Sequence, residues 1–366
     1  MSYFFYFFYS ITPRIVLVHV TPQMSIVHVT PRIVLGTMTF SGQTAKADAL
    51  TMLSTFATHP LATPGSTLAQ IDSARMYGGG KTEELIGEML TENAALRATL
   101  AVASKAHPFM GSVLDTAGVT NQATESIAAL QAESIDLFYL HGPCAKTPIE
   151  ETLAAVQALY ESDKFARFGL SNFTAWETVW IHSFMEKKGW VVPQVYQGML
   201  NVTTRAVVDE LFPALRRLGM AFNAYNPLAG GMLTGKYDRA QMSSLDSGRF
   251  TGAQIWGRIY QDRFMQPLHF DAVDLLRVAC DAESIPMHEM SLRWMMHHSP
   301  LSGSQGDAII IGASKTVHFD SNLAALSKGP LPPAVVAACD EAWLLAKPVC
   351  PSFSRGYAGS ELAAVK

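Results

Sequence analysis

The sequence predicts an α/β protein folded as a single (β/α)8 barrel, with a long loop after the seventh strand and extra helices at the C-terminus. Eight strand–helix units alternate from residue 32 onward. The connections between them are mostly short, which favours a closed TIM-type barrel over an open doubly wound sheet. No linker separates a second domain, and 366 residues with 49% hydrophobic content can bury one large core.

Short apolar runs mark the strands, and longer amphipathic stretches mark the helices between them. Pro148 falls in the first turn of its helix, where a missing backbone N–H is tolerated. The strands are expected at residues 33–38, 68–72, 99–104, 134–140, 165–170, 192–196, 220–224 and 308–312. The helices are expected at residues 44–58, 81–91, 112–131, 148–161, 176–188, 207–218, 268–283 and 287–298, with short ones near Asn322 and Val335.

The segment at residues 228–267, after the seventh strand, breaks this alternation. It is rich in Gly, Ser and Arg and carries few helix signals. A segment this long inside a compact domain is seldom a passive connection, so we expect it to take part in ligand binding.

Three consecutive strands end in residues that can hold or move a proton. Asp72 closes the second strand, Lys105 follows the third and His141 follows the fourth. Tyr77 comes just after Asp72 and is followed by three glycines at residues 78–80, which permit a tight turn or the close approach of a ligand. Because the carboxyl ends of barrel strands meet at one rim, we expect these side chains to gather there.

Composition excludes several classes of function. A net charge of −4 without a basic stripe argues against a nucleic-acid partner. The four cysteines form no CxxC pair, which favours a reduced, cytoplasmic compartment. The adjacent His297 and His298 lie in an expected helix, and no metal site is expected. The apolar N-terminal run is interrupted by Pro13 and Arg14, well short of the roughly 20 residues of a membrane helix, so no membrane partner is expected.

Residues 1–29 are interpreted as a repetitive extension outside the core, and residues 30–366 as the barrel. Ten mostly aromatic residues precede three imperfect nine-residue units, TPRIVLVHV, TPQMSIVHV and TPRIVLGTM. Only the third unit runs into the first strand. Three short units are too few for a solenoid, which favours a local duplication or a wrongly assigned start site.

Several motifs together resemble the aldo-keto reductases over residues 32–345, most closely the aflatoxin-aldehyde and succinic-semialdehyde reductase branch. The motifs are DSARMYGGG, ASK, YLHGP, GLSNF, YQGMLN, AYNPLAGGMLTGKY and GASKTVHFDSN. The resemblance implies a (β/α)8 barrel with a catalytic tetrad at Asp72, Tyr77, Lys105 and His141. It also implies an NADPH-dependent reductase of aldehydes, with ketones as a second class. The partner is a small carbonyl compound, and a homodimer is left open.

The residue types suit this chemistry. Hydride addition places negative charge on a carbonyl oxygen, so a proton donor must be aimed there. Tyr77 is the candidate acid, but a free phenol has a pKa of about 10. The nearby Lys105 ammonium favours the phenolate, and Asp72 keeps the lysine charged and oriented. His141 is the second donor, which orients the carbonyl.

The cofactor contacts also follow from the resemblance. Ser171, Asn172 and Gln197 match partners of the nicotinamide carboxamide, and Tyr225 matches the aromatic that stacks on its ring. The matching positions are Met38, Asp72, Ser171, Asn172, Gln197, Tyr225, Asn226, Pro227, Leu228, Gly230, Gly231, Leu233, Gly235, Lys236, Arg249, Gly312, Ser314, Lys315, His318 and Asn322.

The adenine end of the cofactor site departs from the family at one position. His318 stands where the family usually has Gln or Arg, which leaves the choice between NADPH and NADH open. Lys315 and Arg249 remain as partners for a 2′-phosphate.

Substrate contacts are expected at His141 and within the long segment after the seventh strand. In the resembling branch, a Tyr and an Arg spaced like Tyr260 and Arg263 reach over the barrel mouth toward a distal carboxylate. A guanidinium suits this role because its planar fork meets both carboxylate oxygens. A solvated surface arginine is the alternative.

Two other classes of function stay open. One is a nucleotide-sensing regulatory subunit on the same fold, like the potassium-channel β subunits, with little turnover. The other is a metal-dependent barrel hydrolase, which needs more His and Asp at strand ends than His141 and Asp72.

The repeated TPRIVL units generate a first prediction. Deletion of residues 1–29 should leave an active barrel, because the third unit suffices for the first strand. Circular dichroism and carbonyl-reduction assays on the truncated and full-length chains check this. A truncated chain that fails to fold would show that the extension belongs to the structure.

Overall fold

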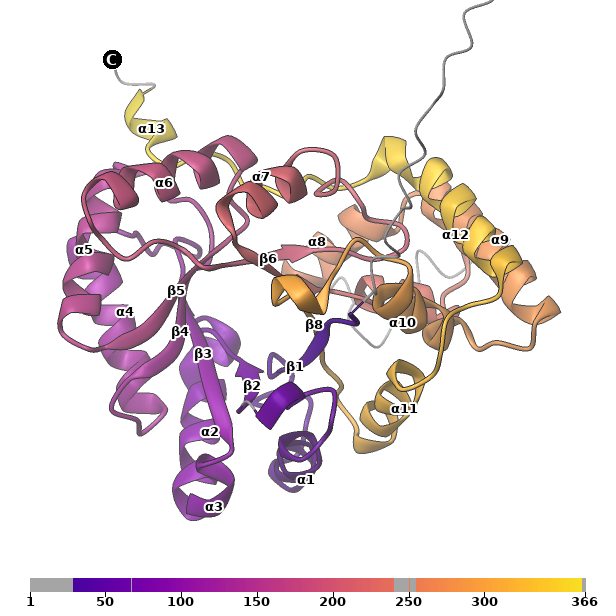
Figure 1. The fold of residues 1–366 in the computed structure, drawn as a ribbon, viewed down its shortest axis with the longest axis horizontal. Helices are drawn as coiled ribbons and strands as arrows, with labels where there is room; N and C mark the ends of the chain where they lie inside the picture. The colour runs from indigo at the N-terminus through magenta and orange to yellow at the C-terminus, as the bar shows by residue number, and fades with distance from the viewer. Residues whose placement is uncertain (1–28, 67, 240–249, 251–254, 364–366) are drawn as a thin grey trace, which may run out of the picture.

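The computed structural model describes residues 29–66, 68–239, 250 and 255–363. Eight parallel strands close into a barrel in sequential order, with β8 paired to β1 (Figure 1). This confirms the predicted fold class. The strands are β1 (Arg32–Gly36), β2 (Ala69–Asp72), β3 (Leu100–Ala106), β4 (Ile135–Leu140), β5 (Phe165–Ser171), β6 (Val195–Met199), β7 (Ala221–Tyr225) and β8 (Ala308–Ile311).

Helices surround the barrel, and two long ones, α9 and α12, pack beside each other at one side (Figure 1). The helices are α1 (Lys46–Ala57), α2 (Lys81–Glu92), α3 (Ala94–Arg97), α4 (Thr116–Ala129), α5 (Ile149–Glu161), α6 (Ala175–Lys187), α7 (Leu211–Leu218), α8 (Ile255–Phe264), α9 (Pro267–Ala282), α10 (Met287–His297), α11 (Thr316–Leu326), α12 (Pro333–Ala346) and α13 (Ser360–Ala363). The extra C-terminal helices are therefore present, and α12 is longer than the short helix expected near Val335.

The sixth strand starts three residues later than predicted. The expected span was 192–196, and β6 begins at Val195. Pro193 explains the shift, because proline has no N–H to donate to the ladder. The first bond on this side comes from the Gln194 N–H to the Phe168 carbonyl at 2.9 Å. As a result Gln197 lies inside the strand rather than after it.

The segment at residues 228–267 contains a helix that the weak local signals did not predict. In α8, Phe264 is fully buried and Tyr260 nearly so, and the two are one helical turn apart. Both rings pack against the buried ring of Phe250, with the Tyr260 centroid 6.0 Å away and the Phe264 centroid 6.5 Å away. Tertiary packing of this aromatic face, rather than helix propensity, accounts for the helix.

The barrel interior is filled below the mouth by Tyr139, whose hydroxyl accepts a hydrogen bond from Asn223 Nδ2 at 3.0 Å. Gly169 on the neighbouring strand makes room for the ring, since a Cβ there would lie 2.5 Å from it. The buried Tyr139 ring therefore closes the barrel below the mouth.

The opposite end of the barrel is tied by a buried carboxylate. Asp307 bonds both terminal nitrogens of Arg216 and accepts from the backbone N–H groups of Phe222 and Ser302, each at 2.8 Å. The Val29 carbonyl accepts from the Gly303 N–H at 2.7 Å at the same end.

All four cysteines are free thiols, three of them buried and Cys350 half-buried. Burial raises the pKa of Cys280 to about 11 and that of Cys339 to about 12. Burial also raises the pKa of Cys350.

Neither a membrane helix nor a metal cluster is found in the part of the chain that the structure describes. None of its helices is long and apolar enough to cross a membrane. Within the same residues, no three His, Cys, Asp or Glu side chains are grouped so as to hold a metal.

His269 generates a prediction about acid stability. It is buried in α9, and neither ring nitrogen has a hydrogen-bond partner among the described residues. Burial lowers its pKa from 6.5 to about 4. The unfolded chain therefore binds this proton first as the pH falls, and stability is lost between these two pKa values.

We expect the low pKa of His269 to reduce the free energy of unfolding by about 2 kcal/mol when the pH falls from 7 to 5. His269→Phe keeps a ring and removes the titration, so its loss over this range should be smaller by that amount. Urea unfolding of both proteins at the two pH values measures the difference. Equal losses would assign the acid sensitivity to other groups.

Candidate active site

The carboxyl ends of β2, β3 and β4 bring together the four residues predicted to form a tetrad. Asp72 is the last residue of β2, and Lys105 lies one residue before the end of β3. His141 follows β4, and its backbone N–H donates to the Ala106 carbonyl at 2.8 Å. The parallel register of neighbouring strands therefore holds all three at one rim.

A buried ion pair lies at the centre of this rim. Lys105 Nζ is 2.8 Å from Asp72 Oδ2 and donates to the Ser73 carbonyl at 2.6 Å. Burial lowers the pKa of the Lys105 ammonium, and the Asp72 carboxylate opposes that shift. Asp72 Oδ1 accepts a further hydrogen bond from Gln197 Nε2 at 2.7 Å, so both carboxylate oxygens are fixed.

Tyr77 lies above the ammonium. It begins the short 3-10 helix η2 (Tyr77–Gly80), and its ring is half-buried. Lys105 Nζ is 5.2 Å from the ring centroid. The turn is completed by Gly78, Gly79 and Gly80, all with positive φ, which confirms the need for glycine in this stretch.

His141 faces Tyr77 edge-on, with the ring centroids 6.1 Å apart. Its Nδ1 is buried and has no hydrogen-bond partner among the described residues. Burial lowers its pKa well below 6.5, and the positive charge of Lys105 adds to the shift. The imidazole is therefore neutral at neutral pH and keeps one N–H to donate.

A second group of predicted residues lies at the ends of β5, β6 and β7. Asn172 Nδ2 donates to the His141 carbonyl and to Ser171 Oγ, each at 2.8 Å. The hydroxyl of Tyr225 donates to Asn172 Oδ1 at 3.0 Å. Asn172 adopts a left-handed conformation with φ 63°, which asparagine tolerates. Its amide thus links three strand ends.

The predicted glycine-rich segment forms a compact turn after β7, the 3-10 helix η3 (Ala229–Thr234). The Gly230 N–H donates to Asn226 Oδ1 at 2.8 Å. Gly230, Gly231 and Gly235 have positive φ, and a Cβ at Gly230 would overlap the Tyr260 ring. Pro227, Leu228, Leu233 and Lys236 belong to the same turn.

The remaining predicted cofactor residues follow β1 and β8. Lys315 is exposed at the N-cap of α11, and His318 is exposed in the first turn of that helix. Asn322, one turn further, is buried. Gly312 and Ser314 precede the helix, and Met38 follows β1. Arg249 lies outside the described residues.

These features fit a nicotinamide dinucleotide. The η3 turn and its C-cap have glycine at positions 230, 231 and 235, and the missing Cβ atoms let a phosphate approach the backbone closely. The exposed Lys315 at the start of α11 adds an ammonium to the positive end of a helix dipole, which suits a second anion.

Besides His141, two residues of α8 were predicted to contact substrate, and their surroundings differ. Tyr260 is 8% exposed and packs against Gly230 and Phe250. Arg263 is half-buried on the same helix, and burial lowers the pKa of its guanidinium. The charge of Arg355 lowers that pKa further.

Arg355 and Phe109 are site residues that the sequence reasoning missed. The backbone N–H of Arg355 donates to the Asn172 carbonyl at 2.9 Å, and the Arg355 guanidinium lies 5.6 Å from the Phe109 ring centroid. Phe109 in turn meets the His141 ring edge-on at 5.6 Å. Arg355 comes after the last predicted helix and carries no strand-end signal, so only the folded chain brings it to the mouth.

Comparison with known proteins agrees with this geometry. Residues 32–344 match the sequence profile of the Aldo/keto reductase family. The chain is 43% identical over 289 residues to human aflatoxin B1 aldehyde reductase member 4, covering 78% of this chain and 87% of the relative. It is 41% identical over 291 residues to human aldo-keto reductase family 7 member A3, covering 78% and 88%. An aldo-keto reductase of Monascus ruber is 34% identical over 319 residues, covering 85% and 91%.

Fold, site and relatives together define an oxidoreductase built on a (β/α)8 barrel. The chain belongs to the aldo/keto reductase family, whose members typically use NADH or NADPH.

Proposed function

We propose that the protein is an NADPH-dependent reductase that converts aldehydes, and ketones as a second class, into alcohols. The observation that carries the proposal is the grouping of Tyr77, His141 and the buried Lys105–Asp72 pair at one rim. The names of the human and fungal relatives, which are aldehyde or aldo-keto reductases, support the same reaction.

Proton delivery is the task of this chain's own residues. When bound, the reduced nicotinamide supplies a hydride to the carbonyl carbon. Tyr77 gives its phenolic proton to the carbonyl oxygen, and the Lys105 ammonium 5.2 Å from its ring stabilises the phenolate left behind. The neutral His141 donates its one N–H to the same oxygen and so orients the substrate. One hydride and one proton convert the carbonyl to an alcohol.

The cofactor's carboxamide can be held by groups that the protein leaves available. Gln197 uses its amide N–H on Asp72, which leaves Oε1 to accept from the carboxamide nitrogen. Ser171 Oγ accepts from Asn172, so its own hydrogen can go to the carboxamide oxygen. Lys315 at the start of α11 is the described partner for a 2′-phosphate and the reason to expect NADPH.

Removal of the phenol tests the reaction. Tyr77→Phe should lose more than about 99% of turnover, because a general acid contributes roughly a hundredfold or more. NADPH affinity should stay near the wild-type value, since the ring still packs. Turnover assays and fluorescence titration with NADPH measure the two quantities. Wild-type turnover in the variant would remove Tyr77 from the mechanism, and a wild-type protein that binds NADPH without turnover would favour the regulatory alternative.

A distal carboxylate is the substrate feature that the site favours. Arg355 is close enough to Arg263 for its charge to lower the pKa of the Arg263 guanidinium, and among the described groups no carboxylate contributes to that shift. Two cations facing a barrel mouth repel each other until an anion joins them. A short carboxylated aldehyde supplies that anion at the far end from its carbonyl.

We therefore predict that succinic semialdehyde is a better substrate than a neutral aldehyde of equal length. A hydrogen bond to a charged group contributes about 1.5–3 kcal/mol, or roughly a tenfold to hundredfold preference. Arg263→Met should raise KM for the acid by about that factor and leave a neutral aromatic aldehyde nearly unaffected.

Steady-state kinetics on both substrates separate the outcomes. An equal loss on both would assign Arg263 to support of the η3 turn or the cofactor. Unchanged kinetics with both substrates would show that Arg263 is a solvated surface residue.

A further inference from the structure

The connection between Asp72 and Tyr77 is hydrogen-bonded to the barrel at its start. The three glycines that follow Tyr77 have little conformational preference of their own. The Ser73 N–H donates to the Ala103 carbonyl at 2.9 Å, and the Arg75 N–H donates to the Lys105 carbonyl at 3.2 Å. Tyr77 comes two residues later and is followed by three glycines. Glycine costs the most conformational entropy to fix. Within the turn the Tyr77 N–H donates to the Ala74 carbonyl at 2.9 Å, and contacts from outside the turn add to this restraint.

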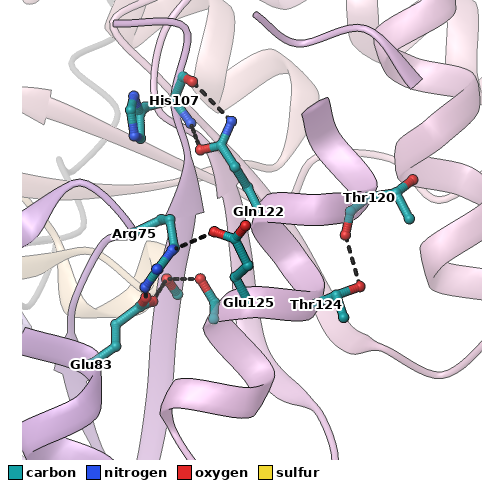
Figure 2. Close-up of polar contacts among 9 residues, drawn as sticks. Arg75, Glu83, His107, Thr120, Gln122, Thr124 and Glu125 are labelled. Carbon is teal, nitrogen blue, oxygen red and sulfur yellow. Dashed lines mark hydrogen bonds and ion pairs between the residues drawn. The ribbon is translucent and has the colours of Figure 1, made fainter. Parts of the chain in front are cut away.

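The side chain of Arg75 joins this connection to two helices. Its Nη1 is 3.1 Å from Glu83 Oε2 on α2, and its Nε is 2.9 Å from Glu125 Oε2 on α4. Figure 2 shows the guanidinium extended between the two carboxylates. It also lies against Gly80, where a Cβ would overlap it.

The two partners are themselves anchored. Glu83 is fully buried and accepts a hydrogen bond from Ser104, the residue before Lys105. The helix α4 is tied to the end of β3 through Gln122, which donates to the His107 carbonyl at 3.0 Å and accepts from the His107 N–H at 2.9 Å (Figure 2). Glu125 stands three residues after Gln122, so the same helix fixes its backbone, while its side chain is largely exposed.

Packing does not replace these ion pairs. A cavity of about 230 Å³ opens beside the connection, lined in part by Arg75, Met76 and Gly79. The connection is therefore open on the side of Arg75, Met76 and Gly79, where the ion pairs of Arg75 restrain it, whereas Gly78 packs closely against Ser41. The Glu83 charge also favours the ammonium form of Lys105, because it opposes the lowering of the pKa of that group.

We propose that Arg75 is a positioning residue for proton transfer: its ion pairs with Glu83 and Glu125 hold the turn that keeps the Tyr77 phenol over the Lys105 ammonium. This inference rests on the proposed reductase function. None of the residues predicted to hold the cofactor, apart from Asp72, belongs to this connection. Loss of Arg75 should therefore slow the chemical step without weakening NADPH binding.

The experiment compares Arg75→Met with a matched control, Arg216→Met. Arg75 is 19% exposed and faces the fully buried Glu83, and Arg216 is 26% exposed and faces the fully buried Asp307. Both variants leave a buried carboxylate without its cation, but Arg216 lies at the opposite end of the barrel. For each protein, Tm, NADPH Kd and the single-turnover rate of NADPH oxidation are measured, the rates well below the lowest Tm.

We expect Arg75→Met to lower the single-turnover rate by about tenfold to a hundredfold, the effect of a small misplacement of a reacting group. Its NADPH Kd should stay within about twofold of wild type, a difference of roughly 0.4 kcal/mol. Arg75→Lys should recover part of the rate, because a single ammonium cannot span both carboxylates. Arg216→Met should lower Tm and leave the rate unchanged.

A wild-type rate in Arg75→Met, with only Tm reduced, would overturn the inference and leave the arginine a structural role. If Arg75→Met does not fold, Glu125→Gln serves instead. It removes one of the two ion pairs and should lower the rate by a smaller factor, and an unchanged rate there would equally overturn the proposal. A wild-type protein without turnover would instead overturn the proposed function, and this inference with it.

Discussion

The Lys105 ammonium lies inside the barrel mouth with no exposed surface, 2.8 Å from the Asp72 carboxylate. Removing an ammonium from water costs several kcal/mol unless an opposite charge and further acceptors replace its hydration. Asp72 and the Ser73 carbonyl provide these acceptors, and Tyr139 closes the space below at 5.7 Å from ring centroid to Nζ. The register between β2 and β3 places the two side chains of this pair within hydrogen-bonding distance. A slip of one residue would turn Lys105 out of the barrel.

Asp72 also links the two halves of the site. One oxygen holds Lys105 and the other accepts from Gln197, which comes from the far side of the barrel. Asn172 makes a second link. Its amide N–H donates to the His141 carbonyl, and its Oδ1 accepts from the Tyr225 hydroxyl. The proton-transfer side and the expected nicotinamide side are therefore one hydrogen-bonded unit. The Asp72 carboxylate is common to both sides, since one of its oxygens holds Lys105 and the other holds Gln197.

Residues at strand ends could be predicted from the sequence, because an apolar run and the polar residue after it are local features. Asp72, Lys105 and His141 were located in this way, and the family resemblance added Tyr77; the barrel brings the four side chains together. Features that depend on distant partners could not be found. Arg355 reaches the mouth through a bond to Asn172, which lies 183 residues earlier in the chain. The helix α8 forms because Phe264 and Tyr260 meet Phe250, and β6 starts late because of Pro193.

The burial of the four cysteines affects how readily carbonyl compounds can modify this protein. Aldehydes are electrophiles, and cysteine reacts with electrophiles as the thiolate. Burial raises the pKa of Cys280, Cys339 and Cys350, so these three groups stay protonated at neutral pH. The fourth, Cys144, is buried and donates its S–H to Thr147. While the barrel stays folded, its cysteines are therefore poor targets for the carbonyl compounds that reach its mouth.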